Sequence, residues 1–439
     1  MKIIHVFVKS YGCSTNLADS EVLAGCLAKA GFKLTNSTSK ADVIIYNTCG
    51  VKGPTENRVI AALNRAPKNK KVIVTGCLPL INFKRLNREV RFDGVIGPAS
   101  GNEITGIVSR VFAGEKVVVL NGALTAKPEL SLPRLMSNPV ISVLPVSYGC
   151  IGSCAYCCVV SARGRLRSHS VKEVTERVKK DLATGVKEFW ITAQDTASYG
   201  KDIDTNLAIL LKKLGDIKGD FRIRVGMMTP NLAKDIMDKL LDAFRSGKIF
   251  KFVHLPVQSG DDMVLQRMNR FYTVQDFREL IDAFKAAFPE VTVATDIICG
   301  FPGENRKAFE NTLKLISEVK PDIVNISKFF ARPGTAAAEL HCTVEPEEIK
   351  RRSTELAKTA RRVALEKNQR WSGWSGDVLV DEKGKLNGSW IGRNFAYKPV
   401  VLKSSADLLG EILKVKIVKA FSTYLEGTIE QRYHKSAEH

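Results

Sequence analysis

Three cysteines stand close together in the segment Cys150-Ile-Gly-Ser-Cys154-Ala-Tyr-Cys157. The segment follows an apolar, strand-like run at residues 141–147. Three thiolates at this spacing can bind three corners of an iron–sulfur cube and leave the fourth iron without a protein ligand. An open iron is a place where a small molecule can bind and react. The sequence therefore predicts a cluster site that takes a further ligand.

Two alternatives for these cysteines are weaker. A structural zinc site usually has four ligands, often as two CxxC or His pairs. The sequence has no second CxxC, and the nearby His169 has no His partner at ligand spacing. Ordinary packing of cysteines in a core does not explain three of them in so short a segment.

Three further cysteines each follow a different strand expected in the N-terminal segment. Cys13, Cys49 and Cys77 follow the first, second and third expected strands, and each has a glycine beside it. Open parallel sheets bind ligands outside the carboxyl ends of their strands, so these thiols can converge on a second cluster. The alternative is chance, because buried cysteine is common at strand ends. The expected strands are residues 3–8, 43–46, 72–75 and 92–96, with helices such as 18–30 between them, which predicts a doubly wound α/β domain over residues 1–116.

The central segment, residues 138–370, repeats a strand-then-helix pattern. Six such units predict a partial (β/α)6 barrel of the triosephosphate-isomerase type, with its site at the carboxyl ends of the strands. A charged helix at 345–370 is expected to pack on this barrel, because its apolar residues recur on one face. The expected strands are residues 140–146, 188–192, 222–227, 252–256, 292–298 and 323–328.

The tail, residues 371–432, has short strands separated by glycine turns, which predicts a small OB-like β-barrel. Such barrels often bind RNA through aromatic and basic side chains. One hairpin interleaves the two kinds of residue, and the alternative is that the aromatic rings fill the barrel core. The expected RNA contacts of this hairpin are Trp390, Arg393, Phe395 and Lys398.

Composition restricts the class of protein. The chain has 439 residues, 44% of them hydrophobic, which fits two or three globular domains. No apolar run has membrane-spanning length, and residues 1–7 lack a signal region, so a cytoplasmic protein is expected. The net charge of +20 favours a polyanionic partner such as nucleic acid. The alternative is a charge that serves solubility alone.

Taken together, the chain resembles the radical S-adenosylmethionine (SAM) methylthiotransferases over nearly its whole length. It is most similar to the archaeal and eukaryotic branch, which acts on N6-threonylcarbamoyladenosine at position 37, beside the tRNA anticodon. The tail resembles that family's TRAM domain, an RNA-binding module. The matching segments are Tyr11-Gly-Cys-Ser-Thr-Asn16, Asn47-Thr-Cys49, Thr75-Gly-Cys77, the three-cysteine segment, Ala162-Arg-Gly-Arg-Leu-Arg167, Gln194-Asp-Thr-Ala-Ser-Tyr-Gly200, Leu255-Pro-Val-Gln-Ser-Gly260, Met268-Asn-Arg270, residues 295–304 and residues 331–335.

The resemblance implies two 4Fe-4S clusters and SAM as cofactors. Cys150, Cys154 and Cys157 would hold the cluster that binds and cleaves SAM, with Cys157 preferred over its neighbour Cys158 because it has the superfamily's spacing. Cys13, Cys49 and Cys77 would hold the second cluster, which carries the inserted sulfur, and a further SAM would supply the methyl group. The implied partner is the anticodon stem-loop of tRNA, with no DNA, no membrane and an electron donor that the sequence does not identify.

Other site residues follow from the same resemblance. Glu188 is expected to pair with the SAM ammonium, and the alternative is a surface salt bridge. Arg332 is expected to neutralise an anionic group, and His254 to line the pocket unless it is an ordinary core histidine. Further expected SAM or pocket contacts are Gln194, Asp195 and Gln258, and further expected RNA contacts are Arg163, Arg165 and Arg167, for which a solvated basic loop is the alternative.

Three other functions remain open from the sequence. Sibling branches of the family act on isopentenyladenosine in tRNA or on an aspartate of a ribosomal protein. An iron–sulfur RNA-binding protein without catalysis would need only the cysteines, the tail and the charge.

Overall fold

The N-terminal segment forms a six-stranded sheet in the computed structural model, which describes residues 3–51, 53–341 and 343–433. The strand order is β2-β1-β3-β4-β5-β6 and neighbouring strands are parallel. Its strands are β1 (His5–Ser10), β2 (Lys33–Leu34), β3 (Val43–Thr48), β4 (Lys71–Gly76), β5 (Gly94–Ile96) and β6 (Val117–Val119). Its helices are α1 (Ser14–Lys29), α2 (Gly53–Asn64), α3 (Leu78–Ile81), α4 (Phe83–Glu89), the 3-10 turn η1 (Gly101–Glu103) and α5 (Ile104–Phe112).

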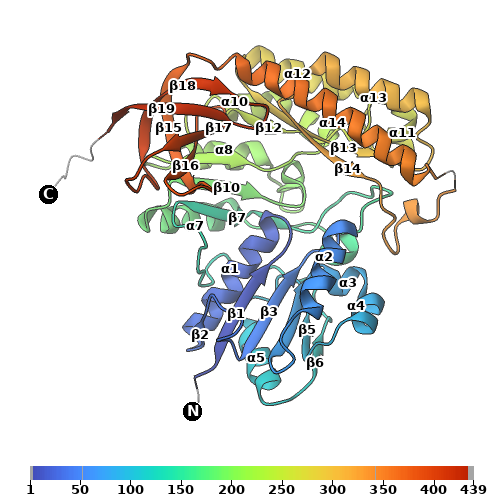
Figure 1. Ribbon diagram of the computed structural model, residues 1–439, viewed down its shortest axis with the longest axis vertical. Helices are drawn as coiled ribbons and strands as arrows, with labels where there is room; N and C mark the ends of the chain where they lie inside the picture. The colour runs from blue at the N-terminus through green and yellow to red at the C-terminus, as the bar shows by residue number, and fades with distance from the viewer. Residues whose placement is uncertain (1–2, 52, 342, 434–439) are drawn as a thin grey trace.

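Helices cover both faces of this sheet, as the doubly wound prediction requires (Figure 1). Side chains of α1 and α5 pack with Val6, Val43 and Ile45 on one face, and side chains of α2 and α4 pack on the other face. The whole of β3 is buried, as expected for a central strand of a parallel sheet. The predicted boundary at residue 116 falls just before β6, which pairs with β5 in the same sheet.

Six parallel strands in chain order form the central half-barrel, which confirms the predicted (β/α)6 architecture. They form two three-stranded sheets, β7-β10-β11 and β12-β13-β14, joined between β11 and β12 by a bridge from Ile223 to Ile249. The strands are β7 (Ile141–Pro145), β10 (Glu188–Thr192), β11 (Arg222–Val225), β12 (Phe252–His254), β13 (Thr292–Cys299) and β14 (Ile323–Lys328). The outer helices are α7 (Val171–Ala183), α8 (Leu207–Gly215), α9 (Pro230–Lys234), α10 (Met237–Phe244), α11 (Asp262–Arg267), α12 (Val274–Ala287) and α13 (Arg306–Val319).

A connecting segment with its own short strands and helix joins β7 to α7. It contains the paired strands β8 (Ser147–Tyr148) and β9 (Arg167–Ser168), with the helix α6 (Val159–Arg163) between them. The three-cysteine segment lies between β8 and α6. Helix α7 begins with a capping box, in which Ser170 and Glu173 satisfy each other's backbone N–H groups.

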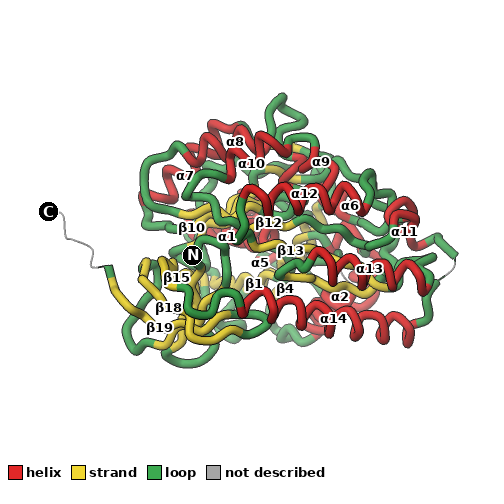
Figure 2. Tube along the Cα trace, turned by 90° about the horizontal axis from the view of Figure 1, so that it is seen from above, coloured by secondary structure: helices red, strands yellow, loops and turns green. Residues whose placement is uncertain are grey.

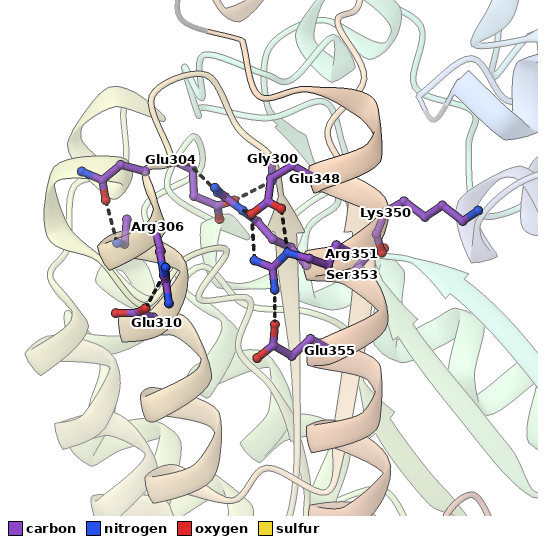
Figure 3. A network of polar contacts seen from close by, with 12 residues as sticks. Gly300, Glu304, Arg306, Glu310, Glu348, Lys350, Arg351, Ser353 and Glu355 are labelled. Carbon is purple, nitrogen blue, oxygen red and sulfur yellow. Dashed lines mark hydrogen bonds and ion pairs between the residues drawn. The ribbon is translucent and has the colours of Figure 1, made fainter.

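The charged helix α14 (Pro346–Gln369) packs on the barrel, as predicted. A network of ion pairs fixes its first turns, and Figure 3 shows it between α13 and α14. Arg352 reaches the buried carboxylate of Glu304 (2.9 Å) and also Glu348 (2.8 Å). Glu304 in turn accepts the N–H of Gly300 at 2.8 Å. The family segment that ends at Glu304 therefore serves here to hold α14 against β13.

The tail forms a closed five-stranded barrel, as predicted. Its strand order is β15-β16-β17-β19-β18. On β18, Leu413, Val415 and Ile417 point inward, while Lys414 and Lys416 are exposed. The strands are β15 (Ser375–Lys383), β16 (Ser389–Arg393), β17 (Pro399–Lys403), β18 (Ile412–Ala420) and β19 (Leu425–Arg432).

The loop between β16 and β17, residues 394–398, packs against the amino end of the central barrel and covers it. The Tyr397 ring lies 4.8 Å from Phe250 and 5.2 Å from Phe252, measured between centroids. The Phe395 carbonyl accepts the Lys251 N–H, and buried Lys398 pairs with Asp322 at 2.7 Å. Figure 1 and Figure 2 both show the C-terminal barrel beside the end of α14. Across the described ranges, no helix has both the length and the apolar content that crossing a membrane requires.

Candidate active site

A cavity of about 620 Å³ lies between the N-terminal sheet and the carboxyl ends of the barrel strands. Cys13, Cys49 and Cys77 line it from the N-terminal side. Gln194, Gly226 and His254 line it from the ends of β10, β11 and β12. The two domains thus build one cavity, at the edge of each sheet where the sequence predicted a site.

The first set of cysteines converges because β1, β3 and β4 are neighbours in the sheet. Cys13 is the N-cap of α1, Cys49 follows β3, and Cys77 is the N-cap of α3. Gly12 has a φ of +130°, and a Cβ there would lie 2.8 Å from the Cβ of Cys49, so only glycine fits. Burial, together with the nearby Cys13 and Cys49, raises the pKa of Cys77 to about 11, against the opposing effect of Arg163.

Arg163 joins this set to the central barrel. Its Nε donates to the Cys77 sulfur at 3.3 Å, and its Nη2 donates to Asn16 at 3.0 Å. Its Nη1 pairs with the buried Asp19 carboxylate at 2.7 Å. Its guanidinium is buried against the protein's own groups in the cavity wall, so it is no part of a solvated basic loop, and its contact with RNA stays a prediction.

The second set, Cys150, Cys154 and Cys157, lies in the loop beyond the carboxyl end of β7. A Cβ on Gly152 would lie 3.3 Å from the Cys150 sulfur and 3.8 Å from the Cys154 sulfur, so the two thiols face the same small space. Burial and the other two thiols raise the pKa of Cys157. These cysteines do not line the cavity described above, but Val159, two residues after Cys157, does.

Residues 268–270 support this loop, a role that the sequence analysis missed. Arg270 donates to the Cys154 sulfur at 3.0 Å, and Asn269 donates to the carbonyl of Ser153 at 2.7 Å. Met268 accepts the N–H of Ala155. The family segment Met268-Asn-Arg270 was the available signal, because a basic residue beside a thiol favours the thiolate.

The two sets have the donor chemistry of iron–sulfur ligands, three thiols each. Within the described part of the chain, no three His, Cys, Asp or Glu side chains are arranged to bind a single metal ion. A four-iron cube is larger than one ion, so its ligands stand further apart than those of a mononuclear site. Cys158 is buried beside Cys77, Ile81 and Ala162, and the preference for Cys157 as the ligand stays a prediction.

Two of the predicted SAM contacts lie in the cavity. Gln194 lines it, and its Oε1 is buried without a hydrogen-bond partner among the described residues. His254 also lines it and is held by Asp296 at 3.0 Å. Asp195 and Gln258 lie next to the cavity and not in its wall. Asp195 accepts the N–H groups of Ala197 and Thr229, at 3.0 and 3.1 Å, so it fixes the loop after β10.

Gln258 has a structural role in the backbone. Its φ is +70°, and its backbone N–H and carbonyl bond to Asp296 and Ile298. This places Gln258 as a bridge to β13, and its side chain is not part of the cavity wall.

Glu188 and Arg332 are corrections to the predicted SAM contacts. Glu188 is fully buried at the amino end of β10, opposite the cavity, where it accepts the indole N–H of Trp190. It faces Asp381, Arg393 and Tyr397 of the C-terminal barrel. Arg332 is buried in an ion pair with Glu56, which also pairs with Arg85, so Arg332 already has a carboxylate partner within the protein.

Burial and the nearby Asp381 raise the pKa of Glu188 to about 8. The folded state therefore holds a proton that the unfolded state releases at lower pH. The stabilisation is fully present below the ordinary Glu pKa of about 4.3 and is lost as pH rises through about 8. We expect the free energy of unfolding, from urea titrations at several pH values, to fall across this window.

Glu188→Gln keeps the acceptor for Trp190 and removes the titrating proton. We expect a flatter dependence of the unfolding free energy on pH in this variant. Part of the slope will remain, since burial also raises the pKa of Asp381, to about 6. An unchanged slope would show that Glu188 does not titrate in this window.

Three of the predicted RNA contacts of the tail, Trp390, Arg393 and Lys398, are used inside the protein, and the contact of the exposed Phe395 stays a prediction. Trp390 packs in the core of the C-terminal barrel, and Arg393 pairs with Asp381 at 3.0 Å and with Glu382 at 2.7 Å. Lys398 is buried against Asp322. Phe395 is partly exposed but packs on the Trp371 and Trp374 rings. This hairpin faces the central barrel, so its basic groups are used inside the protein.

The remaining two arginines of the loop after the cysteines differ from each other. Arg165 is exposed, in agreement with a surface role. Arg167 is half-buried and donates to the carbonyls of Ala126 and Arg163, both at 2.9 Å. Only Arg165 of the predicted loop arginines is free to meet a phosphate.

Comparison with known proteins agrees with this architecture. Residues 144–316 match the radical SAM superfamily, residues 376–429 match the TRAM domain, and residues 5–97 match a family described as Uncharacterized protein family UPF0004. A solved structure with a similar fold is the radical SAM methyltransferase TsrM from Kitasatospora setae, with a TM-score of 0.56 at 12% identity over 87% of this chain and 79% of that chain. The fold and the matches define a multidomain radical SAM protein with a C-terminal TRAM barrel.

Relatives similar over the full length define the family. A protein of Pyrococcus horikoshii named probable threonylcarbamoyladenosine tRNA methylthiotransferase is 38% identical over 97% of this chain and 100% of its own length. The human threonylcarbamoyladenosine tRNA methylthiotransferase is 32% identical over 96% of this chain and 73% of its own length. The chain belongs to the threonylcarbamoyladenosine tRNA methylthiotransferase family.

Proposed function

We propose that this protein converts N6-threonylcarbamoyladenosine at position 37 of tRNA to its 2-methylthio derivative. The cofactors are SAM and two 4Fe-4S clusters, one on each set of three cysteines. The site of action is the anticodon stem-loop, and the setting is the cytoplasm. The electron donor is a partner of unassigned identity.

One observation carries this proposal: Cys13, Cys49 and Cys77 line the same cavity as the carboxyl ends of β10, β11 and β12. A radical SAM barrel alone would serve many reactions, because one fold hosts many functions. A second set of three thiols across the cavity supplies what sulfur insertion needs beyond radical formation. The Pyrococcus and human relatives carry the same named activity over this full architecture.

When bound, the clusters on the two sets of cysteines and SAM would supply the electron, the radical chemistry, the sulfur and the methyl group. The chain's own residues position and enclose the reacting groups. Arg270 and the N–H of Gly152 donate to Cys154 and Cys150, which favours the thiolates that iron requires. Arg163 does the same for Cys77. The unpartnered Oε1 of Gln194 offers the cavity an acceptor for a ligand donor.

The test is incubation of anaerobically reconstituted protein with SAM, a strong reductant and an anticodon stem-loop. We expect the 2-methylthio nucleoside, detected by mass spectrometry, from RNA that carries threonylcarbamoyladenosine. RNA that carries isopentenyladenosine is the matched control and is expected to give none. Product only from the second RNA would reject the proposed substrate, and no SAM cleavage at all would reject the enzyme.

The outer face of β18 gives a separate prediction about RNA binding. Lys414 and Lys416 are exposed on alternate positions of this strand. Replacing both with alanine should weaken binding of tRNA and lower the slope of log K against log salt by about 1.5, because each phosphate contact contributes about 0.7 to 0.9. Filter binding at several salt concentrations measures this slope.

Lys212→Ala is the matched control, since Lys212 is an exposed lysine on α8, where it pairs with Asp242. We expect this control to leave the salt slope unchanged. An equal loss of affinity in the control would mean that general charge, not the face of β18, attracts the RNA.

A further inference from the structure

Four basic side chains line the cavity among the residues described: Arg58, Arg163, Arg224 and His254. Arg163 is neutralised by Asp19, and His254 is hydrogen-bonded to Asp296. Arg58 is exposed, where water can solvate it, and donates to the Thr55 hydroxyl at 3.3 Å. These three side chains therefore have an anion, a hydrogen-bond partner or solvent.

Arg224 differs from the other three. Its Nε is buried and has no hydrogen-bond partner, and in the described ranges no carboxylate pairs with its guanidinium. Its Cζ instead lies 5.2 Å from the Trp190 ring, 5.2 Å from Phe252 and 5.4 Å from Tyr397. Aromatic faces hold a guanidinium in a fixed plane but supply no hydrogen-bond acceptor along its edge.

The depth of Arg224 limits what it can contact. It pairs in register with Trp190, two residues before the cavity-lining Thr192 and Gly226 at the strand ends. Two residues of a strand span about 6.6 Å, so Arg224 lies one pleat inside the barrel. Cys150, Cys154 and Cys157 lie beyond the strand ends. A group that reaches Arg224 from the cavity has therefore passed the strand ends and entered the barrel.

We propose that Arg224 recognises the carboxylate of the threonyl group on the substrate base. This inference rests on the proposed function, which supplies the substrate. A threonylcarbamoyl group carries one free carboxylate, whereas an isopentenyl group carries none. A guanidinium binds a carboxylate with two parallel hydrogen bonds, and Arg224, whose buried Nε lacks an acceptor, gains most from such a partner. Arg224 is thus the residue that selects this modified adenosine.

The test measures binding by the full-length reconstituted protein without turnover. The RNAs are three anticodon stem-loops that differ only at the base: unmodified adenosine, threonylcarbamoyladenosine, and the methyl ester of the latter, which lacks the negative charge. We expect wild-type protein to prefer the carboxylate RNA over the other two by roughly 10- to 100-fold, the range for a charge-assisted pair. Arg224→Gln should lose that preference and keep the affinity for unmodified RNA.

Two further variants sharpen the measurement. Arg224→Lys keeps the charge without the fork and should retain only part of the preference. Arg58→Gln, at the exposed side of the cavity, should lower the affinity for all three RNAs by the same factor and so leave the preference among them unchanged. Visible absorbance of the clusters and thermal unfolding confirm that each variant is folded and loaded.

SAM also carries a carboxylate, so its dissociation constant is measured for the same variants. An unchanged SAM affinity with a lost RNA preference supports the assignment. A retained RNA preference in Arg224→Gln, with or without weaker SAM binding, overturns it. If wild-type protein thiolates the threonylcarbamoyladenosine RNA but Arg224→Gln still binds that RNA more tightly than the other two, the role of Arg224 is rejected and the proposed function stands. Wild-type protein that never thiolates it would instead reject the proposed function.

Discussion

Cys150→Ala will abolish reductive cleavage of SAM, whereas Cys49→Ala will leave SAM cleavage intact and abolish thiolation. The physical reason is that the two residues belong to different sets of thiols, one beyond the end of β7 and one on the N-terminal sheet. Each variant should hold about 4 irons per chain where the wild type holds about 8. Iron analysis, 5′-deoxyadenosine formation and nucleoside mass spectrometry give the three readouts.

Cys26→Ala is the control for this pair. Cys26 is a buried thiol on the apolar face of α1, among Val22, Leu23 and Leu27, so it should retain iron and both activities. Loss of SAM cleavage in Cys49→Ala to the same degree as in Cys150→Ala would contradict the division of labour between the two sets.

Arg163→Met will destabilise the protein and impair the N-terminal set of cysteines without removing any ligand. The substitution leaves the Asp19 carboxylate buried with the Tyr148 hydroxyl, at 3.2 Å, as its one side-chain donor in the described part of the chain. Breaking a buried ion pair in this way costs about 3 to 5 kcal/mol of unfolding free energy. The hydrogen bond to the Cys77 sulfur is also lost, and such supporting contacts are worth about 10- to 100-fold in metal affinity or activity.

The measurements for Arg163→Met separate these effects. Urea unfolding gives the free energy, and iron content with electron paramagnetic resonance reports on the N-terminal cluster. SAM cleavage should persist because Cys150, Cys154 and Cys157 are untouched. Arg165→Met is the matched control, because Arg165 is exposed two residues away, and its unfolding free energy should stay within about 0.5 kcal/mol of wild type. Normal stability in Arg163→Met would show that the pair with Asp19 contributes nothing.

The sequence predicted the strands and the position of the cysteines near the strand ends, because these signals are local. The run from Val43 to Tyr46 is apolar on both faces, as a central parallel strand must be. Cys49 and Cys77 directly follow β3 and β4, and Cys13 comes shortly after β1. Convergence of the thiols of Cys13, Cys49 and Cys77 then follows from strand order alone, since ends of adjacent parallel strands share one edge.

The errors share one cause: the partner of each misassigned residue lies far along the chain. Lys398 meets Asp322 and Arg332 meets Glu56, and no local pattern distinguishes such a buried cation from a surface one. The predicted contact of Glu188 with SAM was wrong for a related reason. It opens its strand, and only the position of the C-terminal barrel reveals that this end is closed off from the cavity. Arg224 was missed because a lone arginine in a strand carries no motif.

The contact of the loop between β16 and β17 with the central barrel limits how domains of different relatives can be combined. Tyr397 contacts Phe250, Phe252 and Arg224, so the C-terminal barrel supplies a side chain that closes the amino end of the central barrel. Replacing the C-terminal barrel with the TRAM domain of another relative would therefore also replace the Tyr397 ring that packs on Arg224. A functional hybrid needs this loop and the amino ends of β10 to β12 inherited from one parent.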